Sequence, residues 1–175
     1  MKMKENSMKT ECGSETETQD RFQSKVLNRK GTFHINGSLN EIFPLLCPKR
    51  EEDWIPGWQC ETIYSESGYN EEGAIFRTTE AYGTELYWTT LQYDSECKYI
   101  DFLLNAPRLF NCRFTFSLVE DDTGMTALVS QSFTSLSGEG SALVERISQE
   151  DLQERLDSLE LHINHYLKTG TMIRA

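Results

Sequence analysis

The sequence predicts an α+β domain in which a curved antiparallel sheet packs around a long C-terminal helix. Between residues 59 and 137, six short segments have the composition of strands and are separated by turn residues. A regular apolar repeat follows, from about residue 148 to residue 170. Because strands and helices are grouped along the chain and do not alternate, the order argues against a doubly wound parallel sheet.

The N-terminal part of this domain contains one strand and two short helices. Residues 25–37 mix β-branched and aromatic side chains and end at Asn-Gly, which predicts a strand. Residues 38–48 begin with Ser38, and Glu41 follows three positions later, which is the pattern of a capping box. Residues 49–58 predict a second short helix that ends at Pro-Gly.

Several of the six later strands alternate apolar and polar side chains. Cys112, Phe114, Phe116 and Leu118 share one face of their strand, as expected for a half-buried sheet. Short connections between consecutive strands predict an antiparallel meander. The six segments are QCETIYSES (59–67), GAIFRTTEAYG (73–83), TELYWTTLQYD (84–94), KYIDFLLNAP (98–107), NCRFTFSLVE (111–120) and MTALVSQSFTSLS (125–137).

The last segment predicts one amphipathic helix. Ser148 is a suitable N-cap with Asp151 three residues later, and Gly170 is a suitable C-terminal stop. Apolar residues recur every three or four positions between these ends. About 20 residues of helix are roughly 30 Å long, enough to cross a small sheet. The glycine-rich residues 137–141 are expected to connect the last strand to this helix.

Composition limits the class of function. The formal net charge is −11 and the pI is about 4.7, without the basic stripe that a nucleic-acid binder needs. No apolar run reaches the length of a membrane span, which indicates no membrane insertion. The five cysteines form no C-x-x-C pair, which favours reduced thiols in a cytoplasmic protein.

Composition also divides the chain into a leader, a folded domain and a tail. Residues 1–24 contain almost no aliphatic side chains and predict a disordered leader. Residues 25–170 form the predicted folded domain, and residues 171–175 a short tail.

The element order, with Trp54-Ile55-Pro56-Gly57-Trp58 before the second strand, resembles the SRPBCC superfamily, the START-like or helix-grip proteins. The sequence is most similar to members of the polyketide cyclase or dehydrase type. Further similarity lies in residues 73–78, in Trp88 with Tyr93-Asp94, and in residues 134–137. The resemblance implies a helix-grip fold, with seven antiparallel strands curved around the C-terminal helix and two short helices after the first strand. It also implies an apolar cavity between them.

Within that fold, candidate ligand-binding residues are aromatic and aliphatic side chains expected to face the cavity. These are Trp54, Trp58, Phe76, Trp88, Phe102, Phe114, Phe116, Leu156, Leu159 and Ile163. Polar side chains could orient a ligand there. The candidates are Arg77, Thr90, Gln92, Arg113, Ser130 and Ser132.

We therefore expect a non-enzymatic module that binds or carries a small hydrophobic ligand, such as a lipid, a polyketide or an aromatic metabolite, with no cofactor and no metal. The alternative is a cyclase or dehydrase that uses an inward-facing His34, Glu80, Glu85 or Asp101. A further alternative is a protein-interaction or chaperone-cofactor module, which would need an exposed apolar patch. His162 and His165 lie three apart on the predicted helix without an evident third metal ligand.

Overall fold

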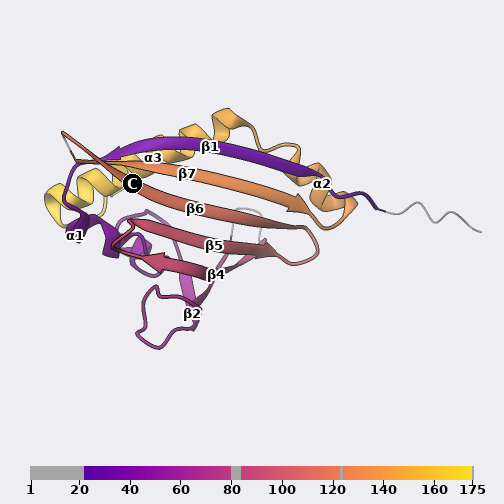
Figure 1. Ribbon diagram of the computed structural model, residues 1–175, viewed down its shortest axis with the longest axis horizontal. Coiled ribbons are helices and arrows are strands. Elements are labelled where there is room, and N and C mark those ends of the chain that lie inside the picture. Colours follow the sequence, from indigo (N-terminus) through magenta and orange to yellow (C-terminus); the bar gives the residue numbers. More distant parts are fainter. Residues whose placement is uncertain (1–21, 80–83, 123, 175) are drawn as a thin grey trace, which may run out of the picture.

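The computed structural model describes residues 22–79, 84–122 and 124–174, which form a seven-stranded antiparallel sheet with a long helix behind it (Figure 1). The order of strands is β1-β7-β6-β5-β4-β3-β2, so strands β2 to β7 form a meander and β1 returns to pair with β7. The strands are β1 (Val26–Ile35), β2 (Cys60–Tyr64), β3 (Ile75–Thr79), β4 (Glu85–Asp94), β5 (Tyr99–Ala106), β6 (Phe110–Asp121) and β7 (Gly124–Ser135). The predicted fold class and all seven strands are confirmed. The predicted leader lies outside the described residues, except for residues 22–24.

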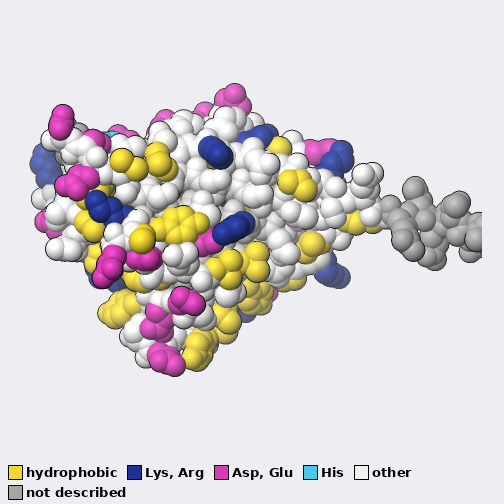
Figure 2. Space-filling view, in the orientation of Figure 1, with side chains coloured by type: hydrophobic (Ala, Val, Ile, Leu, Met, Phe, Trp, Pro, Cys, Tyr) yellow, Lys and Arg dark blue, Asp and Glu magenta, His cyan; other side chains and the backbone are white. Residues whose placement is uncertain are grey.

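The alternation predicted along β5 and β6 is confirmed by burial. Cys112, Phe116 and Leu118 are buried on the inner face of β6, and Ile100 and Phe102 are buried beside them on β5. The opposite, outer face of the sheet is polar for most of its area. Figure 2 shows this face, where apolar side chains are separated by polar and charged ones over the strands.

In strand β4, the residues that face the inner side change from even-numbered to odd-numbered part-way along the strand. Its pairing with β5 shifts between Thr90 and Gln92, which is the signature of a β-bulge. Before the shift, the even-numbered Thr90 is buried; after it, the odd-numbered Tyr93 packs on Phe43 with ring centroids 4.8 Å apart. The bulge leaves Leu91 exposed and turns Gln92 away from the inner face.

The two short helices after β1 are shorter than the sequence indicates. The first comprises α1 (Leu39–Ile42) and a 3₁₀ turn, η1 (Phe43–Leu45), and the backbone N–H of Ser38 donates to Glu41 Oε2 at 2.9 Å, as predicted for a capping box. The second is a single 3₁₀ turn, η2 (Arg50–Asp53). The proline at its C-terminal side, Pro56, limits how far a helix could continue.

The long helix α3 (Gln149–Thr169) begins and ends where predicted. The Ser148 hydroxyl accepts the N–H of Asp151 at 2.9 Å, and the Asp151 carboxylate accepts the N–H of Ser148 at 3.1 Å. At the other end, Gly170 adopts a left-handed φ of 69°, and its N–H donates to the Tyr166 carbonyl at 2.7 Å. No helix in the described part of the chain is long and apolar enough to cross a membrane.

Side chains of α3 also cover the open edge of β1. Gln153 Nε2 donates to the Thr32 carbonyl at 2.9 Å, and Asn164 Nδ2 donates to the His34 carbonyl at 2.8 Å. Glu160 accepts the N–H of His34 at 2.8 Å. These bonds satisfy backbone groups that an edge strand leaves unpaired, and they fix the position of the helix along the sheet.

The glycine-rich segment between β7 and α3 is itself a helix, which the sequence analysis did not predict. Helix α2 (Gly138–Val144) is capped by Ser137, whose hydroxyl accepts the N–H of Gly140 at 3.0 Å. Gly140 is buried against the turn between β5 and β6, so its missing side chain is a packing requirement and not a sign of a loop.

Candidate ligand-binding cavity

A cavity of about 590 Å³ lies between the inner face of the sheet, the N-terminal part of α3 and the segment that contains η2. Its walls are mainly aromatic and aliphatic. The aromatic lining residues are Phe33, Trp54, Trp58, Trp88, Phe102, Phe110, Phe114, Phe116 and Phe133. This volume is within the range of small-molecule sites, which are mostly apolar with a few polar groups.

Trp88 lies at the centre of the aromatic wall. Its ring makes edge contacts with Phe102 at 5.7 Å, Phe114 at 5.9 Å and Trp58 at 6.1 Å, measured between centroids. Its indole N–H donates to Thr78 Oγ1 at 2.9 Å. Edge-to-face contacts and a satisfied indole N–H hold the ring in one orientation.

The other two tryptophans are held by carbonyls of the short-helix segment. Trp54 Nε1 donates to the Leu45 carbonyl at 3.0 Å, and Trp58 Nε1 donates to the Pro48 carbonyl at 2.8 Å. Trp54 is 1% exposed, so it belongs to the core and also forms part of the cavity wall. A role in core packing is therefore compatible with a role in the cavity wall.

Glu51, on η2, is a carboxyl group inside this largely apolar cavity. The side chain lines the hollow and is partly exposed. Burial raises the pKa of Glu51 to about 8, and the positive charge of Arg155 opposes that shift. At neutral pH the group is therefore mainly protonated and can both donate and accept a hydrogen bond.

Replacing Glu51 with glutamine should stabilise the protein at pH 8 and have little effect at pH 5. The folded-state pKa lies above the unfolded value, so stability is lost as the pH rises from 4.5 to about 8, while the unfolded chain ionises and the folded one does not. Allowing for solvent screening in an open cavity, we expect a gain of about 1–2 kcal/mol at pH 8. Urea unfolding of both proteins at the two pH values measures it; an equal difference at pH 5 and pH 8 would contradict the shifted pKa.

The mouth of the cavity carries most of its remaining polar groups. They lie on α3 and just before it: Arg146, Asp151, Arg155, Ser158 and His162. Both arginines are exposed, and the Asp151 carboxylate accepts the Ser148 N–H described above. The cavity therefore has an apolar interior, one partly exposed carboxyl group and a charged rim.

Comparison with solved structures relates this arrangement to known proteins. Norcoclaurine synthase from Thalictrum flavum, in complex with dopamine and hydroxybenzaldehyde, is similar with a TM-score of 0.57 and 15% identity, over 82% of this chain and 88% of the synthase chain. A protein from Rhizobium leguminosarum is similar with a TM-score of 0.58 and 14% identity, over 82% and 97% of the two chains. The chain has the helix-grip fold.

A third similar structure is DynU16, a protein from the dynemicin biosynthetic locus. It matches with a TM-score of 0.56 and 15% identity over 82% of this chain, but over only 48% of its own, so the present chain spans about half of its length. No protein-family model and no curated protein sequence matches the chain. The predicted resemblance to helix-grip proteins is thus confirmed as a likeness of fold.

The structure brings eight of the ten candidate ligand-binding residues to the cavity of the helix-grip domain. Phe76 and Ile163 lie elsewhere. Phe76 is buried in a separate cluster with Cys47, Cys60 and Ala74, and Ile163 is buried in the main core. The lining residues of α3 run from position 151 to position 162, so Ile163 lies just beyond the end of the cavity. The eight that line it are Trp54, Trp58, Trp88, Phe102, Phe114, Phe116, Leu156 and Leu159.

None of the six polar candidates lines the cavity. Arg77 bonds to Glu85 and Arg113 to Asp101, both on the outer face of the sheet. Ser130 and Ser132 flank the residue that faces inward, Gln131, because β7 places its odd-numbered residues on the inner side. The remaining two polar candidates are Thr90 and Gln92. The Thr90 hydroxyl donates to Asn70 Oδ1 at 2.6 Å, and the bulge turns Gln92 away from the inner face.

The acid–base candidates of the sequence analysis are also absent from the lining. His34 lies 3.4 Å from Asp121, and Glu85 pairs with Arg77. Asp101 is buried under Arg113, on the face opposite the cavity. Glu80 lies outside the described residues. Glu51 was missed because it stands in an acidic run, Glu51-Glu52-Asp53, which has the composition of a solvated surface.

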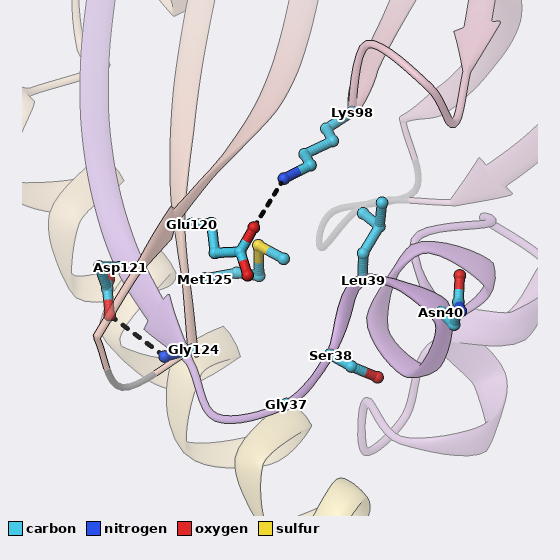
Figure 3. Close-up of a pocket in the computed structure, with 9 residues that line it drawn as sticks. All are labelled: Gly37, Ser38, Leu39, Asn40, Lys98, Glu120, Asp121, Gly124 and Met125. Atoms are coloured by element: carbon cyan, nitrogen blue, oxygen red, sulfur yellow. Dashed lines mark hydrogen bonds and ion pairs between the residues drawn. The ribbon is translucent and has the colours of Figure 1, made fainter.

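A second hollow, of about 540 Å³, lies at the other end of the sheet, beside α1 (Figure 3). Lys98 Nζ is 3.3 Å from Glu120 Oε2 across it, and the N–H of Gly124 donates to Asp121 Oδ1 at 3.1 Å. These polar groups already bond to one another, and few apolar side chains line the hollow. We therefore take the aromatic cavity as the candidate site.

Proposed function

We propose that the protein binds a small hydrophobic ligand in the cavity between the sheet and α3. The observation that carries this proposal is the aromatic wall around Trp88, which encloses an apolar space large enough for a small molecule. Removing apolar surface from water contributes about 25 cal/mol per Å², and this drives a ligand into such a space. Lipids, polyketides and aromatic metabolites have the required apolar surface.

The arrangement of the wall also favours a binding site over a filled core. The indole of Trp88 is held by Thr78 and by neighbouring rings, which reduces the ordering cost of binding. The polar rim leaves one end of a bound ligand in contact with charged groups and water. These features support reversible binding or carriage.

Binding of a neutral environment-sensitive dye, N-phenylnaphthylamine, tests the proposal. In Trp88→Glu, a charge enters the apolar wall, and we expect at least tenfold weaker dye binding. Leu103→Glu, on the outer face of β5, should leave dye binding unchanged. Leu159→Trp fills the cavity from α3 without introducing a charge and should also weaken binding.

Circular dichroism of each variant confirms that the fold is retained. Equal dye affinity in wild type, Trp88→Glu and Leu159→Trp would show that the dye binds elsewhere, and the proposal would fail.

One observation favours a second candidate function, an enzyme of the cyclase or dehydrase type. Such an enzyme needs a titratable group with a shifted pKa inside the apolar site, and Glu51 is such a group. Norcoclaurine synthase has a similar fold and is an enzyme by name. Turnover of a candidate substrate that disappears in Glu51→Gln while binding persists would establish this function. For the protein-interaction alternative, Figure 2 shows separated apolar side chains over β1, β7 and β6, and a closer group of them along the lower part of the sheet near β4.

A further inference from the structure

The charges at the cavity mouth differ from those of the protein as a whole. The chain carries a formal net charge of −11, yet the rim places two arginines, Arg146 and Arg155, beside a single aspartate, Asp151. Glu51, just inside, is mainly uncharged at neutral pH. With Glu51 neutral, the mouth has an excess of positive charge.

The local charges dominate recognition at this position. Salt screens exposed charges beyond about 8–10 Å, so distant acidic residues contribute little to the energy of a group bound at the mouth. The nearer carboxylates, Glu150, Glu154 and Asp157 on α3 and Glu52 and Asp53 on η2, are sequence neighbours of lining residues and oppose an anion. The rim begins at Asp151 in the first turn of α3, where the helix dipole favours an anion, and extends to His162 in the middle of the helix, beyond the reach of that effect. Asp151 offsets part of this field, and its carboxylate is committed to the N-cap by its bond to Ser148.

We propose that the ligand is a carboxylic acid with an apolar body, the body against the aromatic wall and the carboxylate at the mouth between Arg155 and Glu51. This inference rests on the proposed ligand-binding function. Arg155 supplies a charge-assisted hydrogen bond, for which the planar guanidinium matches a carboxylate. Protonated Glu51 donates its O–H to the second carboxylate oxygen.

An amine in the same place would be disfavoured. Its positive charge would lie close to Arg155, and it would require Glu51 to ionise within apolar walls. A neutral alcohol would keep the apolar contacts but would lose the charge-assisted bond. The acid is therefore distinguished from both by groups at the mouth.

Competition for the bound dye by phenylbutyric acid and by phenylbutanol tests the inference, because the two share one apolar body. At pH 7 we expect the acid to displace the dye at a roughly tenfold lower concentration than the alcohol. In Arg155→Gln that preference should disappear while the alcohol competes as before. Arg77→Gln, which removes one positive charge from the outer face, is the matched control and should keep the preference.

The pH dependence tests the part played by Glu51. A bound carboxylate favours the protonated form of Glu51, so the affinity for the acid should fall roughly tenfold between pH 7 and pH 9, through the pKa of about 8. Glu51→Gln should keep a constant affinity over this range. The other titratable or charged groups around Glu51 are Arg146, Asp151, Arg155 and His162 at the mouth, with Cys47 and Cys60 behind.

Burial raises the pKa values of both Cys47 and Cys60, the latter to about 12, so both thiols stay mainly protonated in the range tested. His162→Gln should leave the pH dependence unchanged. The role of Glu51 would be overturned if Glu51→Gln showed the same fall in affinity between pH 7 and pH 9. It would also be overturned if that fall disappeared in His162→Gln.

The outcomes separate this inference from the proposed function. If the dye does not bind to the wild-type protein, the proposed function fails and the inference fails with it. If the dye binds but the acid competes no better than the alcohol, the cavity remains a ligand site and only the acid inference is wrong. Equal loss of preference in Arg155→Gln and Arg77→Gln would also overturn it, because the effect would then be one of net charge.

Discussion

Trp54→Ala is expected to lower the free energy of unfolding by about 3–5 kcal/mol, the usual loss when a buried large aromatic is truncated. Trp54 is 1% exposed and packs in the main core cluster, below the short-helix segment. Its removal also leaves the Leu45 carbonyl without the indole N–H that donates to it at 3.0 Å. Since small domains are stable by about 5–15 kcal/mol, the variant should be close to unfolding.

Urea denaturation followed by circular dichroism measures the loss. Trp54→Phe, which keeps most of the ring, should lose only about 1–2 kcal/mol through the missing hydrogen bond. Leu161→Ala, on α3 and 61% exposed, should be nearly neutral. If Trp54→Ala proved as mild as Leu161→Ala, the short-helix segment would not be anchored by this indole.

Gly140→Ala is the second change with a large expected effect, although it adds only one methyl group. A Cβ at this position would lie 1.7 Å from the Leu109 carbonyl oxygen and 2.6 Å from its carbon. Both are backbone atoms, and the same oxygen accepts the N–H of Leu136 at 2.8 Å, so the turn cannot move without breaking another bond. We expect a loss of about 3 kcal/mol, at the upper end for overpacking.

Gly138, two residues earlier in the same helix, is the matched control. A Cβ there would meet no atom within 4 Å, and alanine is the better helix former. Gly138→Ala should therefore be neutral or stabilise the protein by up to about 1 kcal/mol. Thermal unfolding of the two variants checks the opposite signs; equal effects would show that α2 does not pack on the turn as described.

Local signals along the chain were sufficient to predict most of the fold. The limits of α3 follow from Ser148 and Gly170, because capping and left-handed backbone depend on the residues at the ends themselves. The alternation in β6 follows from a clean period of two. Helix α2 could not be predicted, because one of its glycines, Gly140, is explained by a contact with Leu109, about 30 residues away in sequence.

The candidate site was predictable for its apolar wall but not for its polar groups. The large apolar residues of these strands follow a period of two that marks the inner face, so Trp88, Phe102 and Phe114 were found. Whether a given polar side chain faces the cavity or the solvent changes with a shift of one residue along the strand. The bulge in β4 and the odd parity of β7 moved Gln92 out and Gln131 in. Glu51 needed tertiary structure, because α3 closes over it from about 100 residues away.

The chain contains three tryptophans, and all three lie in the wall of one cavity. Indole emission depends on the polarity of its surroundings, and with excitation selective for tryptophan all of the emission originates at the candidate site. A guest that displaces water there would shift the emission to shorter wavelength, and a guest that absorbs in the same region would quench it. The protein thus carries its own optical reporter of occupancy, and no label needs to be attached.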